Sequence, residues 1–197
     1  MQLGLLDYVD YMAPPPEFAT YGFTTNTAEY QAWINNLDSN GGFEPATAGM
    51  VYALIDSNYS PGFRANAKKI FIVVTDEEFD QGWPYSGMPA PYDSYMTVDE
   101  VKAEMLANEV IVFTIAETTS PYWGDVDSDG DGVPDGQELA EDTGGIRFDI
   151  NDTDWSPMFD SIGQSIASQI TVTRAPLIAD YRLRDGVLTA EEEDNAA

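Results

Sequence analysis

Five consecutive apolar residues, Ile70 to Val74, are bounded by charged residues on both sides. A run this short and this rich in β-branched side chains is typical of a strand buried on both faces, as in a parallel sheet. Thr75-Asp76-Glu77-Glu78 follows directly, so carboxylates are expected where the strand leaves the sheet. Ligands of open α/β sheets bind beyond the carboxyl ends of the strands. The alternative is a core strand followed by a solvated acidic turn.

The rest of the chain alternates between strand and helix patterns. Two strands, Gln2–Val9 and Ala19–Phe23, flank a proline-rich stretch and are expected to pair antiparallel. A second all-apolar strand is predicted at Val110–Ala116 and a short strand at Ile146–Asp149. Helical spacing and cap residues predict helices carrying Tyr30 to Leu37, following Pro45, from Thr97 to about Asn108, from Gln137 to Asp142, and carrying Phe159, Ile162 and Ile166. This alternation predicts an α/β fold with a doubly wound, mostly parallel sheet and an antiparallel edge hairpin.

The order of these pieces resembles a von Willebrand factor type A (vWA) domain over residues 1–170. The matching segments are GLLDYVDY, FATYGFTTNTAEYQAWINNL, NGGFEPATAGMVYAL, KKIFIVVTDEE, VKAEMLANEVIVFTIAE and LAEDTGGIRFDI. The resemblance implies a Rossmann-like sheet of order 3-2-1-4-5-6. In that family the first strand ends in an Asp-x-Ser-x-Ser motif, which supplies most of a metal-ion-dependent adhesion site.

No Asp-x-Ser-x-Ser motif occurs in the sequence. On this resemblance the chain begins at the second strand of the family, so the central first strand is expected to be missing. The inner edge of the strand at 70–74 would then be unpaired, at a cost of about 1–3 kcal/mol for each buried unsatisfied polar group. We expect an upstream segment, a cleaved fragment or a neighbouring chain to supply the strand. The alternative is that Ile170–Arg184 folds back into the gap.

Two adhesion-site positions can be carried over from the resemblance. Asp76 matches the acidic residue after the fourth strand of the family, and Glu44 falls at the usual threonine, with Thr47 one turn later as the alternative. Their hard oxygen atoms would suit Mg²⁺ or Ca²⁺ in an incomplete site. Glu44 is otherwise the N-terminal acid of a helix, favoured by the helix dipole.

The strongest local motif is DSDGDGVPDGQE, Asp127 to Glu138, with acidic residues at positions 1, 3, 5, 9 and 12 and Gly132 at position 6. This is the EF-hand calcium-loop pattern. Pro134 and the non-helical segment before the loop make it more similar to thrombospondin type-3 or dockerin loops. The alternative is a solvated acidic loop. The predicted calcium ligands are Asp127, Asp129, Asp131, the Val133 carbonyl, Asp135 and Glu138.

The composition restricts which partners and which metal ligands the chain can have. The 197 residues include 35 acidic and 8 basic ones, a net charge of -27 that disfavours nucleic acid and anionic lipid as partners. A saline habitat would explain the acidity equally well. Without cysteine or histidine, thiolate and imidazole chemistry are excluded, and oxygen ligands for Ca²⁺, Mg²⁺ or Mn²⁺ remain. No apolar run is long enough to span or insert into a membrane. No secretory signal is visible, so Met1 is interpreted as internal to a longer precursor.

The domain organisation expected is a vWA-like domain at 1–170 with a calcium insert at 125–138, a short β extension at 171–190 and an acidic tail or linker at 191–197. Aromatic residues in the proline- and glycine-rich segment and near the insert are candidate contacts for a protein partner. These are Trp83, Tyr85, Tyr92, Tyr95 and Trp123.

Together these features predict an extracellular, calcium-stabilised adhesion or protein-binding module of a larger bacterial or archaeal surface protein. The alternative is a structural subunit of an extracellular polymer, completed by a strand from a neighbour. An enzyme is not expected. A metal-dependent hydrolase using Asp76, Glu77 and Glu78 is a minor alternative, since no nucleophile motif, histidine or phosphate loop accompanies them.

Overall fold

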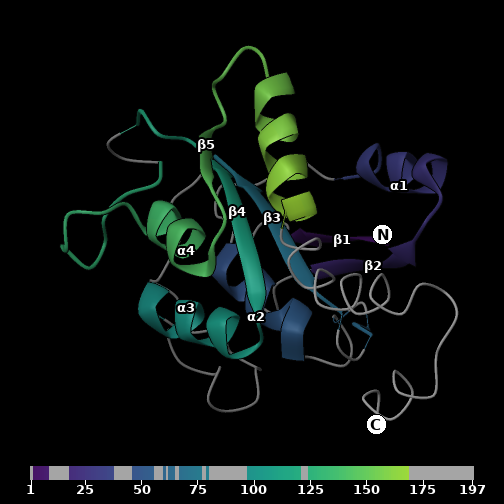
Figure 1. Ribbon diagram of the computed structural model, residues 1–197, viewed down its shortest axis with the longest axis horizontal. Helices are drawn as coiled ribbons and strands as arrows, with labels where there is room; N and C mark the ends of the chain where they lie inside the picture. Colours follow the sequence, from purple (N-terminus) through teal and green to yellow (C-terminus); the bar gives the residue numbers. More distant parts are fainter. Residues whose placement is uncertain are drawn as a thin grey trace, which may run out of the picture. The chain divides into compact units, whose positions relative to one another are not determined.

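The computed structural model describes residues 2–8, 18–37, 46–55, 60, 62–64, 67–76, 79, 97–120 and 124–168. The chain divides into two compact units, unit 1 (Met1–Thr153) and unit 2 (Asp154–Ala197). Unit 1 contains every labelled element (Figure 1). The described part of unit 2, residues 154–168, contains a helix over 156–168, in which Ile162 is buried but Phe159, expected to face inward, is exposed. The predicted β extension and acidic tail lie outside the described residues.

A small antiparallel sheet begins unit 1. Strands β1 (Leu3–Tyr8) and β2 (Phe18–Thr24) pair with Leu6 opposite Thr20, and the register shifts between Leu3 and Leu5. The predicted antiparallel pairing is therefore confirmed, but the predicted place at the edge of the parallel sheet is not. The two strands form a sheet of their own in the part of the chain that the structure describes.

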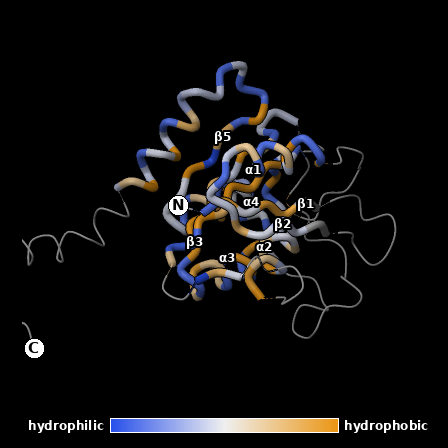
Figure 2. The backbone as a smooth tube through the Cα atoms, turned by 90° about the vertical axis from the view of Figure 1, so that its right-hand side faces the viewer, coloured by the Kyte–Doolittle hydropathy of each residue, from blue (hydrophilic) through white to orange (hydrophobic). Residues whose placement is uncertain are grey.

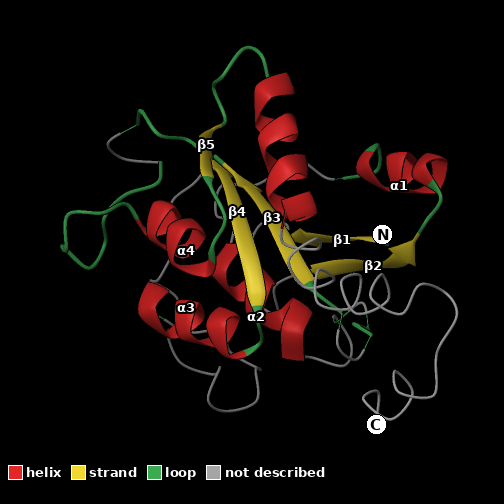
Figure 3. Ribbon diagram, in the orientation of Figure 1, coloured by secondary structure: helices red, strands yellow, loops and turns green. Residues whose placement is uncertain are grey.

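The second sheet is parallel. Strand β4 (Val110–Ala116) lies between β3 (Lys69–Thr75) and β5 (Arg147–Asp149), as Figure 3 shows. Ile70 pairs with Ile111, and the register continues without interruption to Thr75 and Ala116. Every residue of β4 is buried, as expected for an all-apolar central strand. The structure thus confirms a mixed α/β architecture with a parallel sheet.

Four helices of unit 1 begin and end close to the predicted positions. Local capping residues explain where two of these helices begin. The Asn26 side chain accepts hydrogen bonds from the first turn of α1, and Thr97 with Glu100 forms the predicted capping box of α3. Ile34 of α1 and Leu37 just after it are exposed, while Tyr30 and Trp33 are half-buried, so the predicted apolar stripe is only partly covered. The helices are α1 (Thr27–Ile34), α2 (Ala46–Ile55), α3 (Val98–Ala107) and α4 (Asp135–Thr143).

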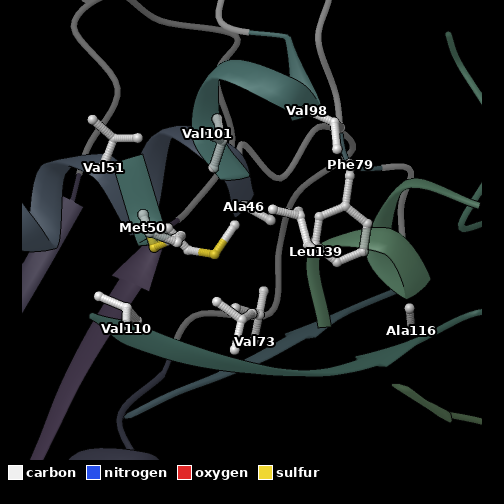
Figure 4. Packing of buried hydrophobic residues seen from close by; sticks show 12 residues of the cluster. Ala46, Met50, Val51, Val73, Phe79, Val98, Val101, Val110, Ala116 and Leu139 are labelled. Atoms are coloured by element: carbon white, nitrogen blue, oxygen red, sulfur yellow. The ribbon is translucent and has the colours of Figure 1, made fainter. Parts of the chain in front are cut away.

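One core joins the parallel sheet to α2, α3 and α4. Val73 and the alternate residues Val110, Val112 and Ala116 contribute one face of the sheet, and the helices cover it (Figure 4). The most apolar stretches of the backbone meet in this region (Figure 2). The helical members of the cluster are Ala46, Met50 and Val51 of α2, Val98, Val101 and Met105 of α3, and Leu139 of α4. Burial of these side chains, worth about 25 cal/mol per Å² of apolar surface, positions the end of β4 and the start of α4.

The opposite face of β3 is incompletely covered. Ile72 and Val74 point away from Val73 because side chains alternate along a strand, and their exposed fractions are 46% and 44%. A cavity of about 220 Å³, lined by Ile72 and Val73 among others, lies between β1, β3 and α2. No helix within the described ranges has the length and apolar character needed to cross a bilayer.

Candidate calcium loop

Three carboxylates of the predicted calcium loop lie together. One oxygen atom from each of Asp127, Asp129 and Asp131 lies within 4.8 Å of the other two, and all three residues are exposed. We call these residues the aspartate triplet. They occupy the first three acidic positions of the predicted motif. Hard carboxylate oxygens at this spacing are ligands that suit Ca²⁺.

Backbone amides organise the triplet. The Asp127 carboxylate accepts hydrogen bonds from the amides of Gly130 (2.7 Å), Asp131 (3.1 Å) and Gly132 (2.8 Å). These bonds, the one from Gly132 first, lower the pKa of Asp127. Gly132 has a φ of 98°, which a side chain would disfavour. The turn predicted at Gly132 is therefore present, and it keeps Asp127 ionised at the centre of the loop.

The other loop residues follow the same local pattern. Asp129 accepts a hydrogen bond from the Asp131 amide (3.0 Å), and Asp131 accepts one from the Val133 amide (2.8 Å). Carboxylates bonded to the backbone two residues later form Asx turns, which wind a short loop without regular secondary structure. The expected use of the Val133 carbonyl as a calcium ligand stays a prediction.

Asp135, the predicted ligand at position 9, lies at the start of α4 and is fully buried. Its carboxylate accepts hydrogen bonds from the Ser128 amide (3.1 Å) and the Ser128 hydroxyl. Burial raises the pKa of Asp135 to about 6, although the bonds from Ser128 oppose the shift. Asp135 therefore links Ser128, near the start of the loop, to α4, and it is not part of the aspartate triplet.

Glu138, the predicted ligand at position 12, forms an ion pair with Lys102 of α3. The Lys102 ammonium also lies 2.8 Å from Asp99 and 3.3 Å from Asp142. Hydrogen bonds to Asp99 and Glu138 raise the pKa of Lys102. The second Glu138 oxygen, Oε2, is buried and has no hydrogen-bond partner among the described residues. To close a calcium shell, Glu138 would have to exchange Lys102 for the cation.

The residue that sequence reasoning missed is Asp125. Its Oδ1 accepts a hydrogen bond from the Gly136 amide at 2.7 Å, and its Oδ2 lies 2.6 Å from Arg147 Nε of β5, at an angle outside hydrogen-bond range. Burial raises the pKa of Asp125, and Gly136 and Arg147 oppose that shift. Backbone bonds from Asp125 to Glu117 (2.7 Å) and from Asp135 to Val126 (2.9 Å) hold the same segment. We call Asp125 and Arg147 the anchor pair.

Little in the sequence separates Asp125 from the other acidic residues of the insert. The available signal was the scarcity of cations: with 8 basic against 35 acidic residues, an arginine on a strand next to the loop is notable. Close packing is the second sign. A Cβ atom added to Gly136 would lie 2.4 Å from Phe79 Cε2 and 2.9 Å from Asp125 Oδ2.

Acidic residues follow all three parallel strands, although they were predicted only after β3. Asp76 is exposed after β3, Glu117 follows β4, and Asp149 ends β5. Nearby hydrogen-bond donors contact two of these carboxylates, Glu117 and Asp149. Glu117 accepts hydrogen bonds from Thr119 and Asn151, and Asp149 accepts one from Thr118. These two carboxylates hold the loops at the sheet edge.

The adhesion-site positions are only partly described. Thr47 lies in α2 with 1% of its surface exposed, and Asp76 is exposed. Glu44 lies outside the described residues, as do the aromatic contact candidates Trp83, Tyr85, Tyr92, Tyr95 and Trp123. The incomplete adhesion site therefore stays a prediction.

Comparisons with known proteins leave the family open. No family model matches the chain, and no curated protein matches it. Among solved structures, the chain is similar to one described as an uncharacterized membrane spanning protein from Vibrio fischeri. The identity is 15%, over 83% of this chain and 75% of that chain, with a TM-score of 0.28. A likeness this distant carries no argument about fold or function.

Proposed function

We propose that the chain is an extracellular, calcium-stabilised adhesion or protein-binding module with a vWA-like fold. The aspartate triplet is the observation that carries this proposal. Three exposed carboxylates held close together repel one another, and a divalent cation removes that repulsion. The ion has a structural role: it fixes the loop between β4 and α4, and so makes the local fold depend on calcium.

Two further features support a binding module. The net charge of -27 favours divalent cations and basic protein surfaces as partners. The predicted vWA-like arrangement places ligand contacts at the carboxyl edge of a parallel sheet, where Asp76 is exposed. The proposal includes no reaction catalysed by the chain.

Calcium titration tests the proposal. Calorimetry on the metal-free protein is expected to give saturable binding of Ca²⁺ at millimolar or lower concentration, and Ca²⁺ is expected to raise the melting temperature. Mg²⁺ should do so less, because it demands tighter octahedral geometry. Absence of both binding and stabilisation would refute the calcium assignment.

A pair of charge-matched variants locates the ion. Asp129→Asn removes one triplet charge, and the asparagine oxygen can still accept the amide of Asp131. Asp152→Asn makes the same change at an exposed residue outside the loop. Asp129→Asn should lose most of the thermal stabilisation by Ca²⁺, whereas Asp152→Asn should keep it. Equal responses would show that any calcium effect comes from overall charge.

The cavity beside β3 favours a second candidate function, a structural subunit of an extracellular polymer completed by a neighbouring strand once bound Ca²⁺ has neutralised the charge that keeps copies apart. Solution mass measured against Ca²⁺ and protein concentration separates the two. A concentration-independent monomer supports the module. Calcium-driven oligomers support the subunit.

A further inference from the structure

The cavity between β1 and β3 lies along the edges of these strands. Four consecutive residues of each strand line it, Leu3 to Leu6 on β1 and Ile70 to Val73 on β3. Consecutive side chains point to opposite faces of a strand. A cavity above one face would therefore meet the side chains of alternate residues. Contact with four in a row favours a position beside the strand, where a further strand would pair.

Over Leu3–Leu6 of β1 and Ile70–Val73 of β3, the described part of the chain shows no further strand paired on that side. There β1 pairs with β2, and β3 pairs with β4. Exposed strand edges with apolar side chains favour pairing with another strand.

The walls of the cavity fit apolar side chains. Ala46, Gly49, Met50 and Ala53 form one stripe of α2 along it, because residues three and four apart share a helix face. On another side, Phe63 packs against Phe23 of β2 (5.3 Å between ring centres) and Phe71 of β3 (5.9 Å). A strand in the cavity would thus bury alternate apolar side chains against α2 and the rings.

We propose that this cavity is a binding slot for one extended β-strand of a partner protein, with apolar residues flanked by basic ones. Pairing edges on β1 and β3 supply main-chain recognition, as in β-strand addition. The flanking charge follows from the net charge of -27, which attracts a basic segment and repels a second copy of the same acidic chain. The inference rests on the proposed binding function and names the class of its partner.

Synthetic peptides test the slot on the full chain. The probe has about five alternating valine and isoleucine residues, about 17 Å when extended, between lysine pairs. The control peptide has the same sequence with N-methyl groups on alternate residues, which remove backbone donors but keep the side chains. Titration followed by calorimetry, with and without Ca²⁺, should show binding of the first peptide and at least about tenfold weaker binding of the second.

Two protein variants locate the peptide. Ile72 and Val74 lie on the same face of β3 with similar exposure, but only Ile72 lines the slot. Ile72→Lys and Val74→Lys add the same charge to the chain. Ile72→Lys should weaken peptide binding at least about tenfold, since it removes an apolar contact, whereas Val74→Lys should change it less than about twofold.

Several results would overturn the slot. These are no binding of the unmethylated peptide, equal binding of the methylated peptide, or equal effects of Ile72→Lys and Val74→Lys. Self-association that Ile72→Lys abolishes would identify a second copy as the occupant and refute a basic partner strand. If Ca²⁺ binds but the peptide does not, only the strand-binding proposal is refuted. Loss of calcium binding with intact peptide binding would reject only the calcium proposal.

Discussion

The anchor pair provides a direct test of how the calcium loop is held. Arg147→Met removes the guanidinium but keeps a long apolar stem. The Asp125 carboxylate, whose side chain has no exposed surface, would then keep the Gly136 amide at 2.7 Å but lose the cation 2.6 Å away. A buried charge left without its partner is the expected result.

Breaking a buried ion pair by removing one partner costs about 3–5 kcal/mol. For a chain of this size, each kcal/mol lowers the melting temperature by about 2–4 °C, so a loss of about 6–20 °C is expected at pH 7. Asp125→Asn combined with Arg147→Met leaves no unpaired charge, and the asparagine oxygen can still accept the Gly136 amide. The double variant should therefore recover at least half of the loss.

Urea unfolding in EDTA of the parent, Arg147→Met, Asp125→Asn and the double variant measures the coupling energy of the pair. The loss in Arg147→Met should also shrink as the pH falls. Burial raises the pKa of Asp125, so without Arg147 the folded protein favours protonated Asp125, and stability is regained in acid. A loss below about 1 kcal/mol, or additive single effects, would refute the buried-charge argument.

Three further predictions concern the loop and α4. Gly136→Ala should destabilise the protein by up to about 2 kcal/mol in urea unfolding, because overpacking against Phe79 and Asp125 outweighs the gain in helix propensity. Gly163→Ala, in a helix with no atom within 4 Å of the added Cβ, should stabilise it by about 0.5–1 kcal/mol, and the same sign for both variants would contradict the packing argument. Because the pKa of Asp135 is raised to about 6 from 3.8, its contribution to stability in EDTA is fully present below about pH 4 and is lost as the pH rises through 6. Thermal melts should show the melting temperature of the parent falling between about pH 4 and 6, and this fall should be absent in Asp135→Asn. The same fall in both proteins would assign it to other titrating groups. If Glu138 is a calcium ligand, calorimetry should show stronger calcium binding for Lys102→Gln and weaker binding for Glu138→Gln. Unchanged affinity in both variants would mean that the aspartate triplet and its neighbours bind the ion without Glu138.

The sequence alone determined the main strands and helices and the three aspartates at the centre of the candidate site. The apolar runs at 70–74 and 110–116 predicted two parallel strands, and Thr97 with Glu100 predicted the start of α3. Asp127, Asp129 and Asp131 were predicted among six calcium ligands, and these three lie together. Such features depend on residues a few positions apart, so periodicity, caps and turn residues encode them directly.

Tertiary structure decided which partner each remaining carboxylate has. Glu138 pairs with Lys102 of another helix, Asp125 with Arg147 of another strand, and Asp135 with Ser128 across the loop. It also placed the edges of β1 and β3 on either side of one cavity. These contacts join residues that the packing of α2, α3 and α4 brings together, and a carboxylate takes the donor or cation that burial leaves within reach. Motif spacing carries no information about that choice, because the same Asp or Glu can bind a metal, cap a helix or neutralise a buried arginine.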